Sequence, residues 1–231
     1  ERMRSFAQGR VNGFTGEHGG SQLDGYVFKS KSPSCALTSA PIQGRGGHGP
    51  GLFAERFTAR WPTVPVVEER GVNRHFVRRL FATFRLRQLF RPLAWTTGDL
   101  VAFHTAHKLL LFSCDPGKTR KLGAFVAGSA KLDALRAVGG YSQGFADILA
   151  AEPTRGREID TLQHCVGYFE PGSPERERAA ALVQGLIGSS DSVEEARAEL
   201  AAMIAAVEID YLQGQHYFVI DDDERAALEV V

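Results

Sequence analysis

The feature that most constrains the fold is a change in the spacing of apolar residues near Asn73. Before it, residues 1–72 are rich in glycine and proline, and their apolar stretches are only a few residues long. After it, apolar side chains recur three and four positions apart, as in Val77, Leu80 and Phe84. This spacing places them on one face of an α-helix. We therefore divide the chain into residues 1–72 and a helical part, residues 73–231.

The first part has the pattern of a small α/β unit. Residues 25–28 and 64–67 are short apolar runs bounded by glycine or proline, which predicts two strands. Between them, residues 43–51 are a glycine-rich loop by composition, and residues 52–57 favour a short helix that ends before Pro62. Strand, loop, helix and strand follow one another in α/β units. Because two strands do not make a stable sheet by themselves, we expect an α/β fragment.

The helical part carries recognisable helix starts. Four positions show them: Thr96, Asp115, Ser173 and Ser192. Thr96 and Asp99 have the spacing of a capping box, and a proline follows both Asp115 and Ser173. We expect the first of these helices to run to about Cys114 and the last to about Val207, with roughly six helices after residue 73. The predicted fold class is an α/β fragment followed by an all-α helical domain, α+β overall and mostly helical.

Composition excludes several classes of protein. Apolar residues are 43% of the chain and charged residues 23%, which is typical of a folded globular protein and not of a disordered one. The longest conspicuous apolar run, residues 109–112, is far shorter than the ~20 residues that span a bilayer. No signal peptide is recognisable. The three cysteines are widely spaced and form no disulfide framework, so we expect a reducing, cytoplasmic location without a membrane partner.

Basic residues are concentrated in the first two thirds of the chain. Residues 1–150 have a net charge of +11 and residues 151–231 of −11. The candidate nucleic-acid-binding residues lie on one predicted helix: Arg74, Arg78, Arg79, Arg85 and Arg87. Guanidinium groups match the geometry of phosphate, and each neutralised phosphate adds a salt-dependent term to binding. The alternative is a solvated helix face that pairs with the acidic C-terminal half, and the sequence favours neither.

Two glycine motifs do not indicate a nucleotide site. Residues 117–119 (GKT) resemble the end of a P-loop, but Phe112 stands where its first glycine belongs. Residues 44–49 (GRGGHG) fit a dinucleotide motif in letters, yet no clear strand precedes them. A metal site on His104, His107 and Cys114 is a further hypothesis, because two histidines three apart share a helix face. The alternative is that His104 packs at a helix–helix contact.

A cysteine in the first part has an informative setting. A predicted strand leads into residues 29–35 (KSKSPSC), where small polar residues leave the sulfur of Cys35 accessible. Such a thiolate could ligate a metal or act as a nucleophile, and the alternative is an ordinary free thiol. Together with residues 49–54 (GPGLFA) and 65–69 (PVVEE), this stretch resembles the C-terminal half of the thiouracil desulfidase-like domain. That family has two further cysteines upstream, in an S-x-C-L-x-G turn and a C-P-E motif, and neither is present. We therefore expect the N-terminal half of the domain to be missing from this sequence.

The helical part resembles a second family, the YbgA-like domain, which often follows the desulfidase domain. Four stretches carry the resemblance, in the family's order: residues 100–108 (LVAFHTAHK), 120–127 (RKLGAFVA), 162–169 (LQHCVGYF) and 213–218 (QGQHYF). Cys114 stands where the family more often has histidine. The positions that match its motifs and carry functional groups are His104, Lys108, Arg120, His164, Tyr168 and Gln215. The resemblance implies no established chemistry for this domain.

The first resemblance implies an activity. In that family three cysteines hold a [4Fe–4S] cluster with one open iron, which takes the sulfur of a thiolated pyrimidine. The substrate would be 2-thiouracil or 4-thiouridine, possibly in tRNA. By position, Cys35 would be a cluster ligand and Ser32 the catalytic hydroxyl that assists proton transfer. With one ligand of three, we expect this chain alone to be inactive, and the alternative is a non-catalytic RNA-binding helical module with a relic α/β segment.

Overall fold

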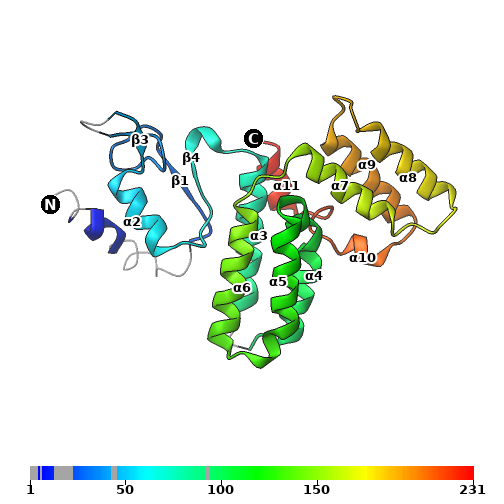
Figure 1. The fold of residues 1–231 in the computed structure, drawn as a ribbon, viewed down its shortest axis with the longest axis horizontal. Coiled ribbons are helices and arrows are strands. Elements are labelled where there is room, and N and C mark those ends of the chain that lie inside the picture. The colour runs from blue at the N-terminus through cyan, green and yellow to red at the C-terminus, as the bar shows by residue number, and fades with distance from the viewer. Residues whose placement is uncertain (1–4, 6, 13–22, 43–45, 92–93) are drawn as a thin grey trace. The chain divides into compact units, whose positions relative to one another are not determined.

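The computed structural model describes residues 5, 7–12, 23–42, 46–91 and 94–231 (Figure 1). They form two compact units: unit 1 comprises residues 1–88 and 226–231, and unit 2 comprises residues 89–225. The described strands are short and all lie in unit 1, whereas unit 2 is built from helices. This confirms the predicted fold class.

Unit 1 contains a parallel pair of strands. Strand β1 (Tyr26–Phe28) pairs with β4 (Val66–Glu68). Parallel neighbours need a crossover connection, and helix α2 (Leu52–Arg60) lies on it. Aromatic rings pack between helix and strand, with the centroids of Phe28 and Phe57 5.4 Å apart. The strand, helix and strand predicted for this segment are confirmed, with ends that differ by at most three residues.

The glycine-rich stretch between them is more regular than the predicted loop. Strand β2 (Ala40–Pro41) pairs antiparallel with β3 (His48–Gly49). Gly46 and Gly47 have φ angles of 62° and 95°, which glycine adopts without a steric penalty. A short 3₁₀ turn, η1 (Glu69–Gly71), then leads to helix α3 (Arg74–Phe90).

Unit 2 is helical, and its local start signals are confirmed. Its elements are α4 (Thr97–Cys114), α5 (Pro116–Gly128), η2 (Ser129–Lys131), α6 (Ala134–Leu149), α7 (Arg155–Val166), α8 (Pro174–Gly185), α9 (Val193–Ala206) and α10 (Asp210–Gln213); α11 (Asp222–Leu228) follows. The side chains of Thr96, Asp115, Ser173 and Ser192 each accept a hydrogen bond from the backbone three residues on. The predicted number of helices was too low, because nine α-helices occur in the described residues after 73.

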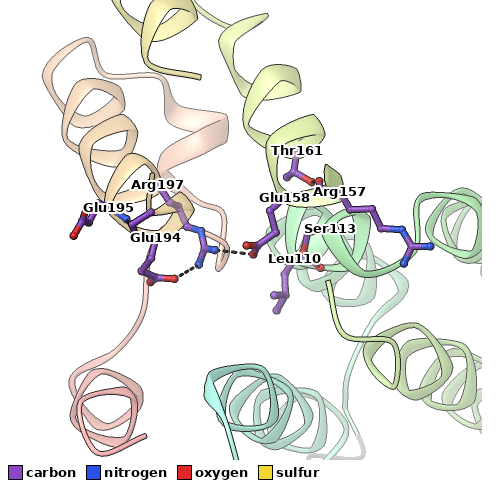
Figure 2. A network of polar contacts seen from close by, with 9 residues as sticks. Leu110, Ser113, Arg157, Glu158, Thr161, Glu194, Glu195 and Arg197 are labelled. Carbon is purple, nitrogen blue, oxygen red and sulfur yellow. Dashed lines mark hydrogen bonds and ion pairs between the residues drawn. The ribbon is translucent and has the colours of Figure 1, made fainter. Parts of the chain in front are cut away.

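Glycines and a buried ion pair hold these helices together. Figure 1 shows α4, α5 and α6 side by side, and α7 with α8 and α9. A side chain at Gly140 of α6 would begin 2.7 Å from the Phe125 ring of α5, so glycine is needed for this close approach. In Figure 2, Arg197 of α9 donates to Glu158 of α7 over 2.7 Å and pairs with Glu194 over 3.1 Å. No helix in the described ranges is long and apolar enough to cross a membrane.

Candidate functional site

The turn around Cys35 is held by its own serines. The backbone N–H of Cys35 donates to Oγ of Ser32 over 3.2 Å, and the sulfur lies 3.1 Å from Oγ of Ser34. Cys35 is half-buried, so its thiol is neither sealed in the core nor fully exposed. Ser32 therefore binds the backbone of the turn.

The first turn of α2 fixes this cysteine turn from one side. The N–H of Phe53 donates to the carbonyl of Ser34 over 2.8 Å, and the N–H of Gly51 donates to the carbonyl of Ala36 over 2.7 Å. These are donors that a helix start leaves without intrahelical partners. A side chain at Gly51 would begin only 2.4 Å from the carbonyl carbon of Ser34. Only glycine fits against this backbone.

The end of β4 fixes the same loop from the other side. The carboxylate of Glu68 accepts hydrogen bonds from the N–H of Thr38 over 2.9 Å and from the N–H and hydroxyl of Ser39. These bonds, led by that of Thr38, lower the pKa of Glu68 to about 2. Glu69 accepts from the N–H of Ser30 over 2.5 Å. The three stretches that resemble the desulfidase domain thus meet around one loop.

The cysteines present do not fit a cluster that needs three of them. The sequence has three, Cys35, Cys114 and Cys165. The last two lie in helices of unit 2 and are fully buried, and burial raises the pKa of Cys165 to about 12, which disfavours the thiolate that binds metal. Within the described ranges, no group of three or more His, Cys, Asp or Glu side chains could hold a metal ion. We derive no catalytic step through an iron–sulfur cluster.

The arginines of α3 make contacts within unit 1. Arg74 donates to the carbonyl of Leu228 over 2.9 Å, and Arg87 forms an ion pair with Asp24. The guanidinium of Arg85 lies 6.0 Å from the ring centroid of Phe81. The other two arginines of the set, Arg78 and Arg79, are half-buried and also have partners. The set therefore helps to hold unit 1 together, and its role in nucleic-acid binding stays a prediction.

Three helices of unit 2 line an open pocket of about 710 Å³. Its lining residues come from one face of α4, one face of α5 and the end of α7: Val101, His104, Thr105, Lys108, Leu109, Phe112, Thr119, Arg120, Gly123, Val126, Ala127 and His164. On α4, His104, Lys108 and Phe112 are four residues apart, so they share a face. The structure thus brings together four of the six positions that match the YbgA-like motifs.

The polar groups of this pocket are basic or neutral. Among the residues that line it, all of them described, there is no aspartate or glutamate. Lys108 and Arg120 are exposed and form no ion pair within the described part of the chain. Burial and the charge of Lys108 lower the pKa of His104, so its imidazole is neutral at pH 7. The pocket therefore combines two exposed positive charges with an apolar wall.

A small residue keeps the pocket open beside His104. Nδ1 of His104 lies 3.3 Å from the hydroxyl of Tyr141, which is buried and holds the ring. A side chain at Gly123 would begin 3.4 Å from Nε2 of His104. Glycine here leaves space for a ligand in front of the imidazole. Gly123 and Phe112 were not predicted as site residues from the sequence, although Phe112 continues the four-residue spacing of His104 and Lys108.

The three residues of α4 in the metal hypothesis each make a different contact within the protein. His107 is buried, and its ring stacks on Phe103 with 4.0 Å between the centroids. Cys114 is fully buried, and its carbonyl accepts a hydrogen bond from Arg157 over 2.6 Å. His104 packs against Tyr141 at a helix–helix contact, as the alternative interpretation held. The structure gives the metal hypothesis no support in the described residues.

Gln215, the last motif position, supports the backbone of α4 behind the pocket. Its side-chain oxygen accepts from the N–H of Leu109 over 3.1 Å, and its NH₂ donates to the carbonyl of Thr105 over 2.7 Å. In a regular helix these two backbone groups, four residues apart, would bond to each other. Because Gln215 is fully buried and bound on both sides, it has a structural role.

Comparison with known proteins bears on the helical part. Residues 108–220 match the model of DUF1722, a family described as a protein of unknown function. The chain is 28% identical over 143 residues to the uncharacterized protein YbgA of Escherichia coli (strain K12). The aligned residues cover 61% of this chain and 84% of that protein. The helical part is therefore similar to YbgA, and we call it the YbgA-like domain for this similarity. The pocket residues from Lys108 to His164 lie inside the matched range of this YbgA-like domain. No solved structure matches the chain.

Proposed function

We propose that the YbgA-like domain binds RNA and that the pocket between α4 and α5 holds one of its nucleotides. The observation that carries this proposal is the pairing of Lys108 and Arg120 with an apolar wall in a pocket that no carboxylate lines. A nucleotide has the same two parts, a phosphate and a flat, weakly polar base. The volume of the pocket lies within the roughly 300–1,000 Å³ that is typical of small-molecule sites.

Each part of the nucleotide has a suitable partner. The phosphate binds to Lys108 and Arg120, because ionised donors make the strongest hydrogen bonds to anions. The base lies against Phe112 and Val126, and the neutral imidazole of His104 offers a hydrogen bond to it. Removing either cation should cost about 1.5–3 kcal/mol, the usual value of a hydrogen bond to a charged group. This corresponds to roughly ten-fold to hundred-fold weaker binding.

The test is a fluorescence-anisotropy titration with a labelled single-stranded oligouridylate, together with calorimetry on uridine 5′-monophosphate. Lys108→Ala and Arg120→Ala should weaken the binding of both ligands. Lys121→Ala is the matched control, because it removes the same charge from an exposed position of α5 that does not line the pocket. For the oligouridylate, each lost phosphate contact should also reduce the slope of log K against log salt by about 0.7.

A second variant separates the pocket from general charge. Gly123→Val keeps every cation but fills the space in front of His104, so it should abolish binding of the mononucleotide. If Lys108→Ala binds as Lys121→Ala does, and Gly123→Val binds as the unmodified protein does, the ligand does not occupy this pocket. That result would refute the proposal.

A second candidate function concerns unit 1. The three stretches around Cys35 resemble the desulfidase domain, and their convergence on one loop supports desulfurisation of thiolated pyrimidines as the activity of a protein that supplies further cluster ligands. The test joins this chain to a segment that supplies those ligands, reconstitutes the joined protein anaerobically with iron and sulfide, and follows the loss of thiocarbonyl absorbance from 4-thiouridine. Conversion that is lost in Cys35→Ser and kept in Cys114→Ser supports this candidate. Conversion that is unchanged in Cys35→Ser refutes it, and so does a cluster-loaded protein without conversion.

A further inference from the structure

A row of four aromatic rings begins in the pocket and continues beyond it: Phe112, His164, Tyr168 and Tyr211. Phe112 and His164 both line the pocket, and their rings stack with centroids 5.7 Å apart and planes 25° apart. The next ring, Tyr168, meets His164 edge-on at 5.7 Å. Tyr211 of α10 stacks on Tyr168 with centroids 4.9 Å apart and planes 20° apart. Each ring therefore touches the next.

Local backbone structure places two of these rings on one side. His164 lies in the last turn of α7, and Tyr168 follows four residues later. Although α7 ends at Val166, the N–H of Tyr168 still donates to the carbonyl of Cys165 over 3.1 Å. The chain therefore keeps turning, and Tyr168 comes to lie next to His164. This backbone hydrogen bond helps to place Tyr168, which lies in the turn that follows α7.

The outer part of the row is accessible. Tyr168 is 40% exposed, and His164 is also exposed. By contrast, Tyr141 and Tyr217 in the same unit are fully buried. Tyr211 supports the ring of Tyr168 from behind and is half-buried. The row thus presents an aromatic face to solvent, beside the pocket that carries the exposed side chains of Lys108 and Arg120.

We propose that this aromatic row binds the base next to the nucleotide in the pocket, so that the domain selects single-stranded RNA over a mononucleotide and over duplex RNA. This inference rests on the proposed nucleotide pocket. The π-face of an unpaired base stacks on an aromatic side chain whatever its sequence, whereas the bases of a duplex are already stacked on one another. Lys108 and Arg120 set the phosphate, and Tyr168 receives the neighbouring base.

The test compares three ligands on the unmodified protein and on variants of Tyr168. The ligands are uridine 5′-monophosphate, a short single-stranded oligouridylate and the duplex of that strand with oligoadenylate. Tyr168→Leu keeps apolar bulk against Tyr211 but removes the π-face, and it should weaken oligouridylate binding by about five-fold to a hundred-fold. Its affinity for the mononucleotide should not change, which also shows that the pocket is folded. Tyr168→Phe keeps the ring and should bind as the unmodified protein does.

The outcomes separate this inference from the function on which it rests. Tighter binding of oligouridylate than of mononucleotide, lost in Tyr168→Leu and kept in Tyr168→Phe, supports the row. Mononucleotide binding that depends on Lys108, with no gain for the oligouridylate or no effect of Tyr168→Leu, overturns the row and leaves the pocket. Equal competition by the duplex also overturns it. Absence of mononucleotide and oligouridylate binding refutes both proposals.

Discussion

Replacement of Arg197 by alanine should destabilise unit 2 far more than replacement of another paired arginine. Arg197 lies on α9 with its side chain 7% exposed, between Glu158 of α7 and Glu194 of its own helix (Figure 2). Its guanidinium also lies 4.7 Å from the ring centroid of Tyr217. Alanine would remove two ion pairs and this contact, and would leave the carboxylate of Glu158 without its partner.

The expected magnitude follows from burial. Breaking a buried ion pair by removing one partner costs about 3–5 kcal/mol, because a charge remains buried and uncompensated. The side chain of Glu158 is 22% exposed and can regain some water, so we expect the lower end, about 3 kcal/mol. For a unit of this size, that loss lowers the melting temperature by about 10 °C.

The assay is urea unfolding followed by far-UV circular dichroism, which reports mainly on the helices. Arg178→Ala is the control, because Arg178 pairs with Glu175 over 3.0 Å but is 70% exposed. Exposed pairs contribute only about 0.2–1 kcal/mol. If the two variants lose the same free energy of unfolding, the ion pair of Arg197 is not the buried contact that holds α7 and α9 together, and the reasoning is refuted.

Three further substitutions test other parts of the structure. Gly51→Ala should destabilise unit 1 by about 1–3 kcal/mol, because its new carbon would overlap the backbone of the cysteine turn. Stability of unit 1 should fall as the pH drops from about 4.5 towards 2, since the pKa of Glu68 is about 2 in the folded chain and 4.5 ordinarily, and Glu68→Gln should flatten this dependence. Gln215→Leu should cost unit 2 about 0.5–1.5 kcal/mol for each of the two hydrogen bonds that its side chain makes to the backbone of α4.

Matched controls exist for each of these. Gly9→Ala adds the same carbon where nothing lies within 4 Å, and it should not destabilise unit 1. Glu55→Gln is the control for Glu68→Gln, because it makes the same charge change on the exposed surface of α2. Gln213→Leu is the control for Gln215→Leu, because it makes the same substitution at an exposed glutamine. Trp95→Phe leaves Trp61 in the core of unit 1 as a fluorescent reporter of that unit. Equal stability of Gly51→Ala and Gly9→Ala would contradict the first argument. An unchanged pH dependence in Glu68→Gln would contradict the second, and equal destabilisation by Gln215→Leu and Gln213→Leu would contradict the third.

Local signals allowed several helices to be predicted from sequence, and long-range packing explains those that were missed. The capping box of Thr96 and Asp99 spans four residues, so it can be read without knowledge of the fold. Helix α6 contains Gly140 and Gly144, each of which lowers helix propensity by about 1 kcal/mol. These glycines are needed because Phe125 and Leu122 of α5 pack against them. That requirement comes from another helix and is invisible in the sequence of α6.

In the candidate site, too, local spacing could be predicted from the sequence and the packing of distant helices could not. The spacing of His104 and Lys108 puts them on one helix face, and the sequence is sufficient for that. Their proximity to Arg120 and His164 depends on how α5 and α7 pack against α4, which spacing within one helix does not give. For α3, the run of arginines left two interpretations open, an RNA-binding face or a face that pairs with the acidic C-terminal half. The sequence did not reveal that Arg74 and Arg87 bind groups far away in the chain.

Gln215 shows why a motif position does not by itself define a role. The resemblance placed it beside His104 and Lys108 as a candidate for function. In the structure it must accept one hydrogen bond and donate another to two backbone groups one helical turn apart. A carboxylate could only accept, an ammonium could only donate, and a hydroxyl is too short to span both groups. An amide side chain meets this structural demand, so a glutamine at this position is explained without a ligand. By contrast, Lys108 and Arg120 form no ion pair with the described residues that would explain them.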